Sequence, residues 1–400
     1  MVGRQAIGLF DGNAAYVGVD REIARFAQDS DRVTGKAAAA FEKRFTQWCS
    51  ADQGLMVSSG VQAAEVALAI AGVRSGSKVV VPALCSEAMA RALLRSGADL
   101  TVIDVDPETL TMDPAAVKAA FADKELRKFG GPQAIIVSHL FGHPAHVERI
   151  REAVDNRLVT VIEDCDGAQG ALMSGRRIGG LGDLAAFSFS QTSALPVPGS
   201  AGLVLASNND KAEALSHLSM VLQHQAGQVE ASGLSKKSAD RVWKDMRETG
   251  VWPDPVEDLI ASVAIGRLEA VDGSNLRRQR LAGTYEKICR QLGIIGPAER
   301  TWAMHAFQAY VCRLPEDQKD QRDILMDGLL DQGIGTTALP CAAPLDHPAL
   351  KDQIASGTDG CPNAKMAANE MFTIPMYPSL QSDHINRIFE ALKRGIAGSP

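Results

Sequence analysis

The chain has 400 residues, 46% of them apolar, and a formal net charge of -7. At roughly 100 to 200 residues per domain, this length predicts about two domains with sizeable cores. Basic and acidic residues are interspersed without a cationic stripe, which excludes a typical nucleic-acid partner, and no apolar run approaches the roughly 20 residues of a membrane span.

The first half of the chain alternates short apolar runs with helical stretches. After a helical pattern over 22–49, strands are expected at 55–57, 78–82, 100–105, 133–141, 158–163, 184–189 and 202–206, and helices at 61–71, 87–96 and 114–121. The runs are almost continuously apolar, which is typical of strands covered on both faces. The pattern predicts a doubly wound α/β domain with a mostly parallel sheet.

Beyond residue 208 the pattern changes to longer helical stretches. A helical pattern covers 259–271 and continues over 277–292, followed by a strand at 306–313 and helices at 321–333 and 383–395, with the most loop-like stretch at 356–362. We therefore expect a large domain over 1–255, N-terminal segment included. A connecting helix and a smaller C-terminal α+β domain are expected over 256–400.

The cysteines and histidines give no strong metal signal. Seven cysteines are scattered without a C-x-x-C pair, so we expect reduced thiols and no metal centre, with Cys165 a buried thiol. His139, His143 and His146 have a ligand-like spacing, but Gly142 and Pro144 between them indicate a turn. The N-terminus lacks a basic stretch followed by an apolar one, so no signal peptide and a cytoplasmic location are expected.

Motifs at the predicted strand ends carry a family resemblance. They are Val57-Ser58-Ser59-Gly60, Val80-Val81-Pro82-Ala83, His139-Leu140-Phe141-Gly142, Val161-Ile162-Glu163-Asp164, Phe187-Ser188-Phe189 and Ile374-Pro375-Met376-Tyr377. Over roughly residues 32–392 the chain resembles the DegT/StrS-type aminotransferases, which put amino groups on nucleotide-linked keto sugars. The resemblance implies the fold type I architecture of pyridoxal phosphate (PLP) enzymes and a homodimer.

The resemblance also implies where a cofactor would bind. The PLP phosphate would lie on the backbone N–H groups of Gly60 and Val61 at a helix N-terminus, with the hydroxyl of Ser188 beside it. Asp164 stands where a carboxylate keeps the pyridine nitrogen protonated. Each of Gly60, Asp164 and Ser188 also has a purely structural interpretation, as a turn, a helix cap or a strand end.

Other positions depart from the family pattern. The pattern Phe-Ser-Phe-x-x-x-Lys has Ser193 in place of the lysine, and no lysine occurs over 129–210. Ser86 replaces an aromatic ring that stacks on the cofactor, Gly167 replaces a glutamine, and Gln169 replaces a histidine. The loop usually written Y-N-x-R is Trp252-Pro253-Asp254-Pro255, and proline has no N–H to donate. Because Ser86, Gly167 and Ser193 are small, we expect something to refill the space.

These departures leave three functional hypotheses. A hydroxyl cannot form an imine, so no covalently bound cofactor is expected. The first hypothesis is a repurposed, PLP-independent enzyme of sugar-nucleotide or natural-product biosynthesis that holds a nucleotide-linked or otherwise anionic small molecule. Its catalytic residues would be Asp164, Ser193 and His139, the last as a base for Ser193. The second is a dehydratase-like enzyme with non-covalent PLP or pyridoxamine phosphate (PMP). The third is an inactive subunit in a heterodimer with an active aminotransferase.

Overall fold

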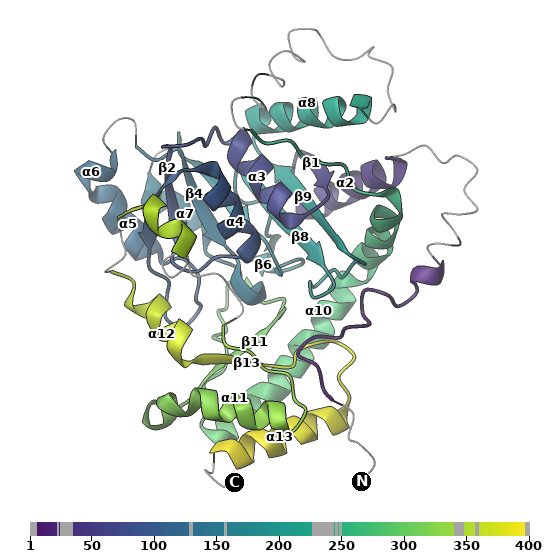
Figure 1. The fold of residues 1–400 in the computed structure, drawn as a ribbon, viewed down its shortest axis with the longest axis vertical. Helices are drawn as coiled ribbons and strands as arrows, with labels where there is room; N and C mark the ends of the chain where they lie inside the picture. Colours follow the sequence, from purple (N-terminus) through teal and green to yellow (C-terminus); the bar gives the residue numbers. More distant parts are fainter. Residues whose placement is uncertain are drawn as a thin grey trace.

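A computed structural model describes residues 6–21, 24, 35–127, 131–155, 158–225, 244, 247, 250–339, 348–356 and 360–396. A large sheet with its covering helices forms one part of the molecule, and a smaller group of helices and short strands forms the other (Figure 1). Among the described residues, no helix is both long enough and apolar enough to span a bilayer.

The large sheet has eight strands in the order β1-β9-β8-β5-β4-β2-β3-β12. They are β1 Gln53–Val57, β2 Lys78–Pro82, β3 Asp99–Ile103, β4 Ala134–Ser138, β5 Thr160–Asp164, β8 Leu184–Ser190, β9 Ser200–Ala206 and β12 Ile354–Ser356. All neighbouring pairs are parallel except those that β9 makes with β1 and β8. The predicted fold class, a mostly parallel doubly wound sheet, is confirmed.

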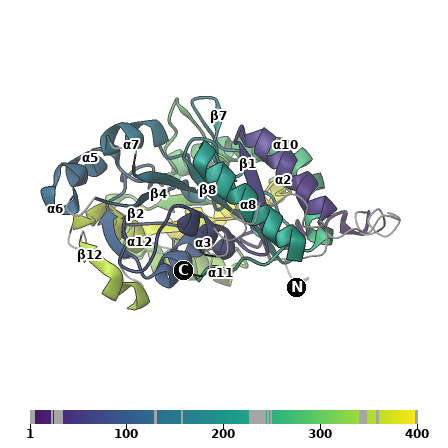
Figure 2. The same cartoon turned by 90° about the horizontal axis from the view of Figure 1, so that it is seen from above.

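Helices cover both faces of this sheet. α3 (Gly60–Ile70), α4 (Glu87–Ser96) and α8 (Asn209–Gln225) share a core with one face, and α2 (Lys36–Cys49), α5 (Pro114–Ala122) and α7 (Val147–Val154) share a core with the other. Figure 2 shows α3 on one side of β2 and β4, and α5 and α7 on the other. Because side chains alternate along a strand, Val79 and Val81 enter the first core and Val80 enters the second.

The helix α10 (Asp258–Leu292), 35 residues long, connects the large part of the molecule to the smaller part (Figure 1). It packs against the antiparallel pair β11 (Tyr310–Arg313) and β13 (Met371–Ile374) and against α11 (Arg322–Asp331) and α13 (Ser382–Ile396). The other short elements are α6 Lys124–Arg127, β6 Leu172–Met173, β7 Arg176–Arg177, β10 Ala303–Met304 and α12 Pro362–Glu370.

Some sequence expectations differ from the structure. The strand expected at 306–313 begins only at Tyr310, because the backbone N–H groups of Ala306 and Gln308 donate to the carbonyls of Gly142 and Phe141 at 2.8 and 2.9 Å. The strand expected at 133–141 ends at Ser138, because residues 140–142 form a short 3-10 turn in which Phe141 has φ +58°. Of the helix expected over 22–49, only α2 from Lys36 onward is found, and residues 22–23 and 25–34 lie outside the described part.

The expected domain boundary between residues 255 and 256 stays a prediction, and strand pairing crosses it at two places. β12 belongs to the second segment but pairs with β3 at the edge of the large sheet. At the other end of the chain, Ile7 pairs with Ile334 and is buried in the core of the smaller part. Both segments therefore contribute to both parts of the molecule.

Candidate active site

Four strands of the large sheet end at one edge and bring the expected site residues together. β1, β4, β5 and β8 run in the same direction, so Gly60, Ser138, Asp164 and Ser188 follow or occupy their carboxyl ends. This edge is where open α/β sheets bind their ligands, because loops and helix N-termini converge there. We refer to it as the carboxyl edge.

Asp164 lies at the end of β5 and is 3% exposed. Its Oδ2 accepts hydrogen bonds from the Ser86 N–H at 2.9 Å and the Ser138 hydroxyl at 2.8 Å, and its Oδ1 accepts one from the Ser86 hydroxyl at 2.7 Å. Ser86 is the N-cap of α4 and accepts from the Met89 N–H at 3.1 Å. Three donors and a helix N-terminus thus stabilise the carboxylate, and the Ser86 side chain is fully used in doing so.

Gly60 and Ser188 are in direct contact. A Cβ placed on Gly60 would lie 2.4 Å from Ser188 Cβ, so only glycine allows α3 to begin this close to β8. Ser59 caps the helix by accepting a hydrogen bond from the Gln62 N–H at 3.2 Å. The start of α3 therefore lies beside the Ser188 hydroxyl. The first N–H groups of this helix, including that of Val61, have no partners within the helix.

Asp166 is a second carboxyl group at this edge, and we did not predict it from the sequence. It is partly exposed and accepts a hydrogen bond from the Ser188 side chain. Burial, and then the charges of Asp164 and Glu87, raise the pKa of Asp166 to about 7, although the bond from Ser188 opposes the shift. Its position two residues after Asp164 was the only signal in the sequence.

The space beside Gly167 is occupied by a side chain from the smaller part of the molecule. Gly167 has φ +73°, and a Cβ there would lie 2.7 Å from Cδ of Gln308. The Gln308 amide also donates to the Thr192 carbonyl at 3.5 Å. The expectation that something refills the space left by small residues holds at this position, and the filling group belongs to the chain itself.

Ser193 is a buried turn residue, 3% exposed. Its Oγ accepts from the Ser190 N–H at 3.2 Å and lies 3.0 Å from the Ser190 carbonyl and 2.6 Å from the Leu195 carbonyl. Lys211, the first lysine after the gap, donates to the Ile70 carbonyl at 3.1 Å. Because Ile70 ends α3 and Gly60 begins it, this amine lies at the far end of the helix from the site.

The hydrogen-bond partners of His139 are Glu163 and Ala145 rather than Ser193. His139 is 0% exposed, its Nδ1 accepts from the Ala145 N–H at 2.9 Å, and its Nε2 therefore donates to Glu163 Oε2 at 3.0 Å. Glu163 also accepts from the N–H groups of Gly179, Leu181 and Gly182 at 2.6 to 2.8 Å. Burial alone would raise the pKa of Glu163, but His139 and these N–H groups hold it below its ordinary value. The pair anchors the 179–182 loop.

A potential metal-binding group lies behind this edge. Within the described ranges, His139, Glu163 and Cys165 are the only three such side chains whose ligand atoms all lie within 4.8 Å of one another. However, His139 and Glu163 already have hydrogen-bond partners, and burial together with the charges of Glu163 and Asp164 raises the pKa of the Cys165 thiol well above its ordinary value. The predicted buried thiol is confirmed. His143 and His146 instead pack on Trp302.

The loop Trp252-Pro253-Asp254-Pro255 lies against the start of α3 in its own chain. The Asp254 carbonyl accepts from the Ser58 N–H at 3.0 Å, and its carboxylate accepts from the Gln62 amide at 2.7 Å. Gln169 is fully buried and donates to the Ser188 carbonyl at 2.7 Å. The loop and Gln169 therefore support the α3 and β8 ends of the site.

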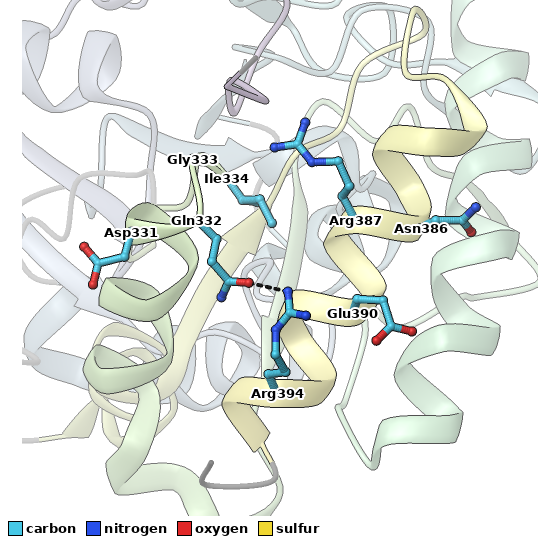
Figure 3. A pocket seen from close by; sticks show the side chains of 8 residues that line it. All are labelled: Asp331, Gln332, Gly333, Ile334, Asn386, Arg387, Glu390 and Arg394. Carbon is cyan, nitrogen blue, oxygen red and sulfur yellow. Dashed lines mark hydrogen bonds between the residues drawn. The ribbon is translucent and has the colours of Figure 1, made fainter. Parts of the chain in front are cut away.

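A surface groove of about 710 Å³ lies elsewhere, between the end of α11 and one face of α13 (Figure 3). Its charged side chains are mixed in sign, and Arg394 on α13 donates to the Gln332 amide oxygen. None of its lining residues belongs to the carboxyl edge of the sheet. We therefore place the candidate active site at that edge.

Comparison with known proteins agrees with this fold. A model of the DegT/DnrJ/EryC1/StrS aminotransferase family matches residues 19–393. The chain belongs to this family. The spore coat polysaccharide biosynthesis protein SpsC of Bacillus subtilis (strain 168) is 26% identical over 377 residues, 91% of each chain.

Two solved structures of similar proteins have the same fold. S. venezuelae DesV in complex with a ketimine intermediate is 26% identical, with a TM-score of 0.82 over 99% of this chain and 100% of DesV. E coli GDP-4-keto-6-deoxy-D-mannose-3-dehydratase with bound hydrated PLP is 16% identical, with a TM-score of 0.81 over 98% of this chain and 100% of the dehydratase. At that identity the dehydratase shows the fold alone.

The DegT/DnrJ/EryC1/StrS family comprises PLP-dependent sugar aminotransferases of sugar and natural-product biosynthesis. The residues of this chain fit that cofactor poorly. The Ser188 side chain interacts with Asp166, the space beside Gly167 contains Gln308, and three of the roughly four acceptor sites of Asp164 already have donors. The described lysine nearest in sequence to Ser193 is bonded at the far end of α3. We derive no reaction step through PLP.

Proposed function

We propose that this chain is a PLP-independent enzyme of sugar or natural-product biosynthesis that transfers a proton at the carboxyl edge of its sheet. Membership of the aminotransferase family supports the biosynthetic setting. The observation that carries the proposal is the pair of neighbouring carboxyl groups, Asp164 and Asp166, at the carboxyl edge. The resemblance of the sequence motifs implies a serine, Ser193, at the lysine position of the family. The chemistry available there is exchange of protons rather than formation of an imine.

The two carboxyl groups have different surroundings and therefore different roles. Asp164 is almost fully buried, and its carboxyl oxygens are held in place by three hydrogen-bond donors. Asp166 is partly exposed, and burial and the Asp164 charge raise its pKa to about 7. A general acid or base works best when its pKa is close to the operating pH. We assign proton transfer to Asp166, its electrostatic tuning to Asp164 and its orientation to Ser188.

The other expected catalytic residues have supporting roles in this proposal. The Ser193 hydroxyl is bonded to backbone groups of Ser190 and Leu195, so we assign it to the turn after β8. His139 has a partner at each ring nitrogen and anchors Glu163. The non-covalent PLP or PMP alternative is disfavoured by the Asp166 carboxyl group on Ser188.

The names of similar proteins suggest the substrate class. SpsC is described by its part in polysaccharide biosynthesis, and a 27% identical relative is a dTDP-3-amino-3,4,6-trideoxy-alpha-D-glucose transaminase of Streptomyces venezuelae. We propose that the substrate is a nucleotide-linked keto sugar or a related small ketone, because a carboxylate can remove a proton from the carbon next to a carbonyl group.

Hydrogen exchange in heavy water tests this proposal. Cofactor-free protein is incubated with GDP-4-keto-6-deoxy-D-mannose and a panel of other nucleotide-linked keto sugars, and deuterium at carbon is measured by mass spectrometry. We expect protein-dependent exchange with at least one member, lost in Asp166→Asn and retained in Ser193→Ala and in the exposed control Asp99→Asn. Amino transfer that requires added PLP, or equal exchange in Asp166→Asn, would contradict the proposal.

A further inference from the structure

A cavity of about 360 Å³ lies between the large and the smaller part of the molecule. Its walls come from the loop after β3, the turn after β4, the segment 295–300 that follows α10, and β11 with the residue before it. Because β3 and β4 are parallel to β2, the loop and the turn both lie at the carboxyl edge, where ligands of open α/β sheets bind. None of Asp164, Asp166 and Ser188 lines this cavity.

One segment of the chain contacts both the cavity and the candidate active site. Ala309 lines the cavity, and the side chain of the preceding residue, Gln308, lies against Gly167. The Gln308 backbone N–H donates to the Phe141 carbonyl at 2.9 Å, and Phe141 also lines the cavity. A ligand in the cavity would therefore contact the segment that fills the space beside Gly167.

The walls of the cavity are mostly apolar, and both arginines among its lining residues are paired. Arg300 forms an ion pair with Glu108, and Arg313 forms one with Glu370 at 3.6 Å. The remaining charged residue of the lining, Glu299, is exposed to solvent. Because no buried charge is left without a partner, the cavity favours an uncharged ligand. The apolar walls include Pro107, Leu110, Phe141, Ile295, Val311 and Met371.

His143 gives the cavity wall a hydrogen-bond acceptor that lacks a donor. The residue is 3% exposed, and its Nδ1 donates to the Pro144 carbonyl at 2.8 Å. Burial lowers the pKa of His143 to about 4, so at neutral pH the imidazole is uncharged and Nε2 has a lone pair. Within the described part of the chain, this Nε2 has no hydrogen-bond partner. A buried acceptor without a donor costs free energy, which a donor on a ligand would recover.

We propose that this cavity binds an uncharged ring compound that carries an N–H or O–H group, and that His143 Nε2 accepts the hydrogen bond. A cavity of roughly 150 Å³ binds benzene, so one of about 360 Å³ has room for a bicyclic compound such as indole. The proposal goes beyond the function proposed above, because it concerns a second site that requires neither Asp166 nor proton transfer.

Indole and benzofuran test the proposal, because they have nearly the same shape but benzofuran has an oxygen in place of the N–H group. Their binding to the full chain is measured by calorimetry. Leaving a buried acceptor without its donor costs about 10- to 100-fold in affinity. We expect the parent to prefer indole by that factor and His143→Phe to bind both probes with similar affinity. His146→Phe is the matched control, because His146 packs on the same Trp302 but does not line the cavity.

A cavity-filling variant shows where the probes bind. Ala309→Leu adds apolar volume to the cavity wall, so it should bind neither indole nor benzofuran while remaining folded in thermal unfolding. The proposal would be overturned by equal affinity of the two probes in the parent, by an unchanged preference in His143→Phe, or by no binding of indole to the parent at its solubility limit. Indole binding to a folded Ala309→Leu variant as tight as to the parent would also overturn it. Because none of these measurements involves proton exchange, failure of the proposed function would leave them unchanged.

Discussion

Replacing Asp166 with asparagine should change how the stability of the protein depends on pH. The pKa of Asp166 is raised from 3.8 to about 7 by burial and by Asp164. Between these values the unfolded chain has released this proton and the folded chain retains it, so the free energy of unfolding of the parent falls as pH rises. Asparagine has nearly the shape of aspartic acid, and its side-chain oxygen can accept a hydrogen bond from Ser188, but its side chain does not titrate in this pH range.

The size of the effect follows from the shift. One pKa unit corresponds to about 1.4 kcal/mol, so the full shift corresponds to about 4 kcal/mol. Asp166 is partly exposed, and solvent screening reduces this value, so we expect Asp166→Asn to gain about 2 kcal/mol relative to the parent between about pH 4 and pH 8. Glu42, whose pKa burial also raises to about 7, is present in both proteins and cancels in the comparison.

Urea unfolding of the two proteins across this pH range measures the effect, with Asp99→Asn as the exposed control. The difference in unfolding free energy between Asp166→Asn and the parent should grow in favour of the variant as pH rises. A difference that stays constant with pH, or that grows equally in Asp99→Asn, would refute the assignment of a raised pKa to Asp166.

Three further predictions concern the residues around the site. Gly167→Ala should destabilise the protein by about 2 kcal/mol in thermal or chemical unfolding, because its φ is +73° and its Cβ would overlap Gln308; adding Gln308→Ala should recover part of the loss, and a neutral Gly167→Ala would contradict the packing described. Glu163→Gln should cost about 3 kcal/mol, because an amide donor would face backbone N–H groups and His139 would lose a charged partner; an unchanged melting temperature would exclude that role. Cys165 should resist iodoacetamide in the folded protein at pH 8 and react after unfolding, because it is fully buried and its pKa is raised; rapid alkylation of the folded protein at Cys165 would contradict this.

Local signals in the sequence predicted some elements to the residue. β2 coincides with the apolar run over 78–82, and α4 begins after a serine N-cap and ends before Gly97, whose φ of 65° closes the helix. In contrast, residues 306–309 are as apolar as a strand, but their backbone bonds to Phe141 and Gly142 in the other part of the molecule. No local pattern contains that contact.

The difference between local sequence signals and contacts between distant segments also applies to the candidate site. Gly60, Asp164 and Ser188 can be proposed from the sequence because they belong to motifs at strand ends. Asp166 cannot, since its proposed role depends on an interaction with Ser188 on a neighbouring strand. The contact of Gln308 with Gly167 likewise joins the two parts of the molecule, and the sequence around either residue does not predict it.

We expect that this family member does not hold PLP through a lysine. To test this directly, the purified protein is incubated with PLP, reduced with borohydride and digested, and every lysine peptide is searched by mass spectrometry. We predict no phosphopyridoxyl group on any lysine beyond the level found in unfolded protein. A single lysine modified in stoichiometric amount, with matching visible absorbance before reduction, would contradict the account.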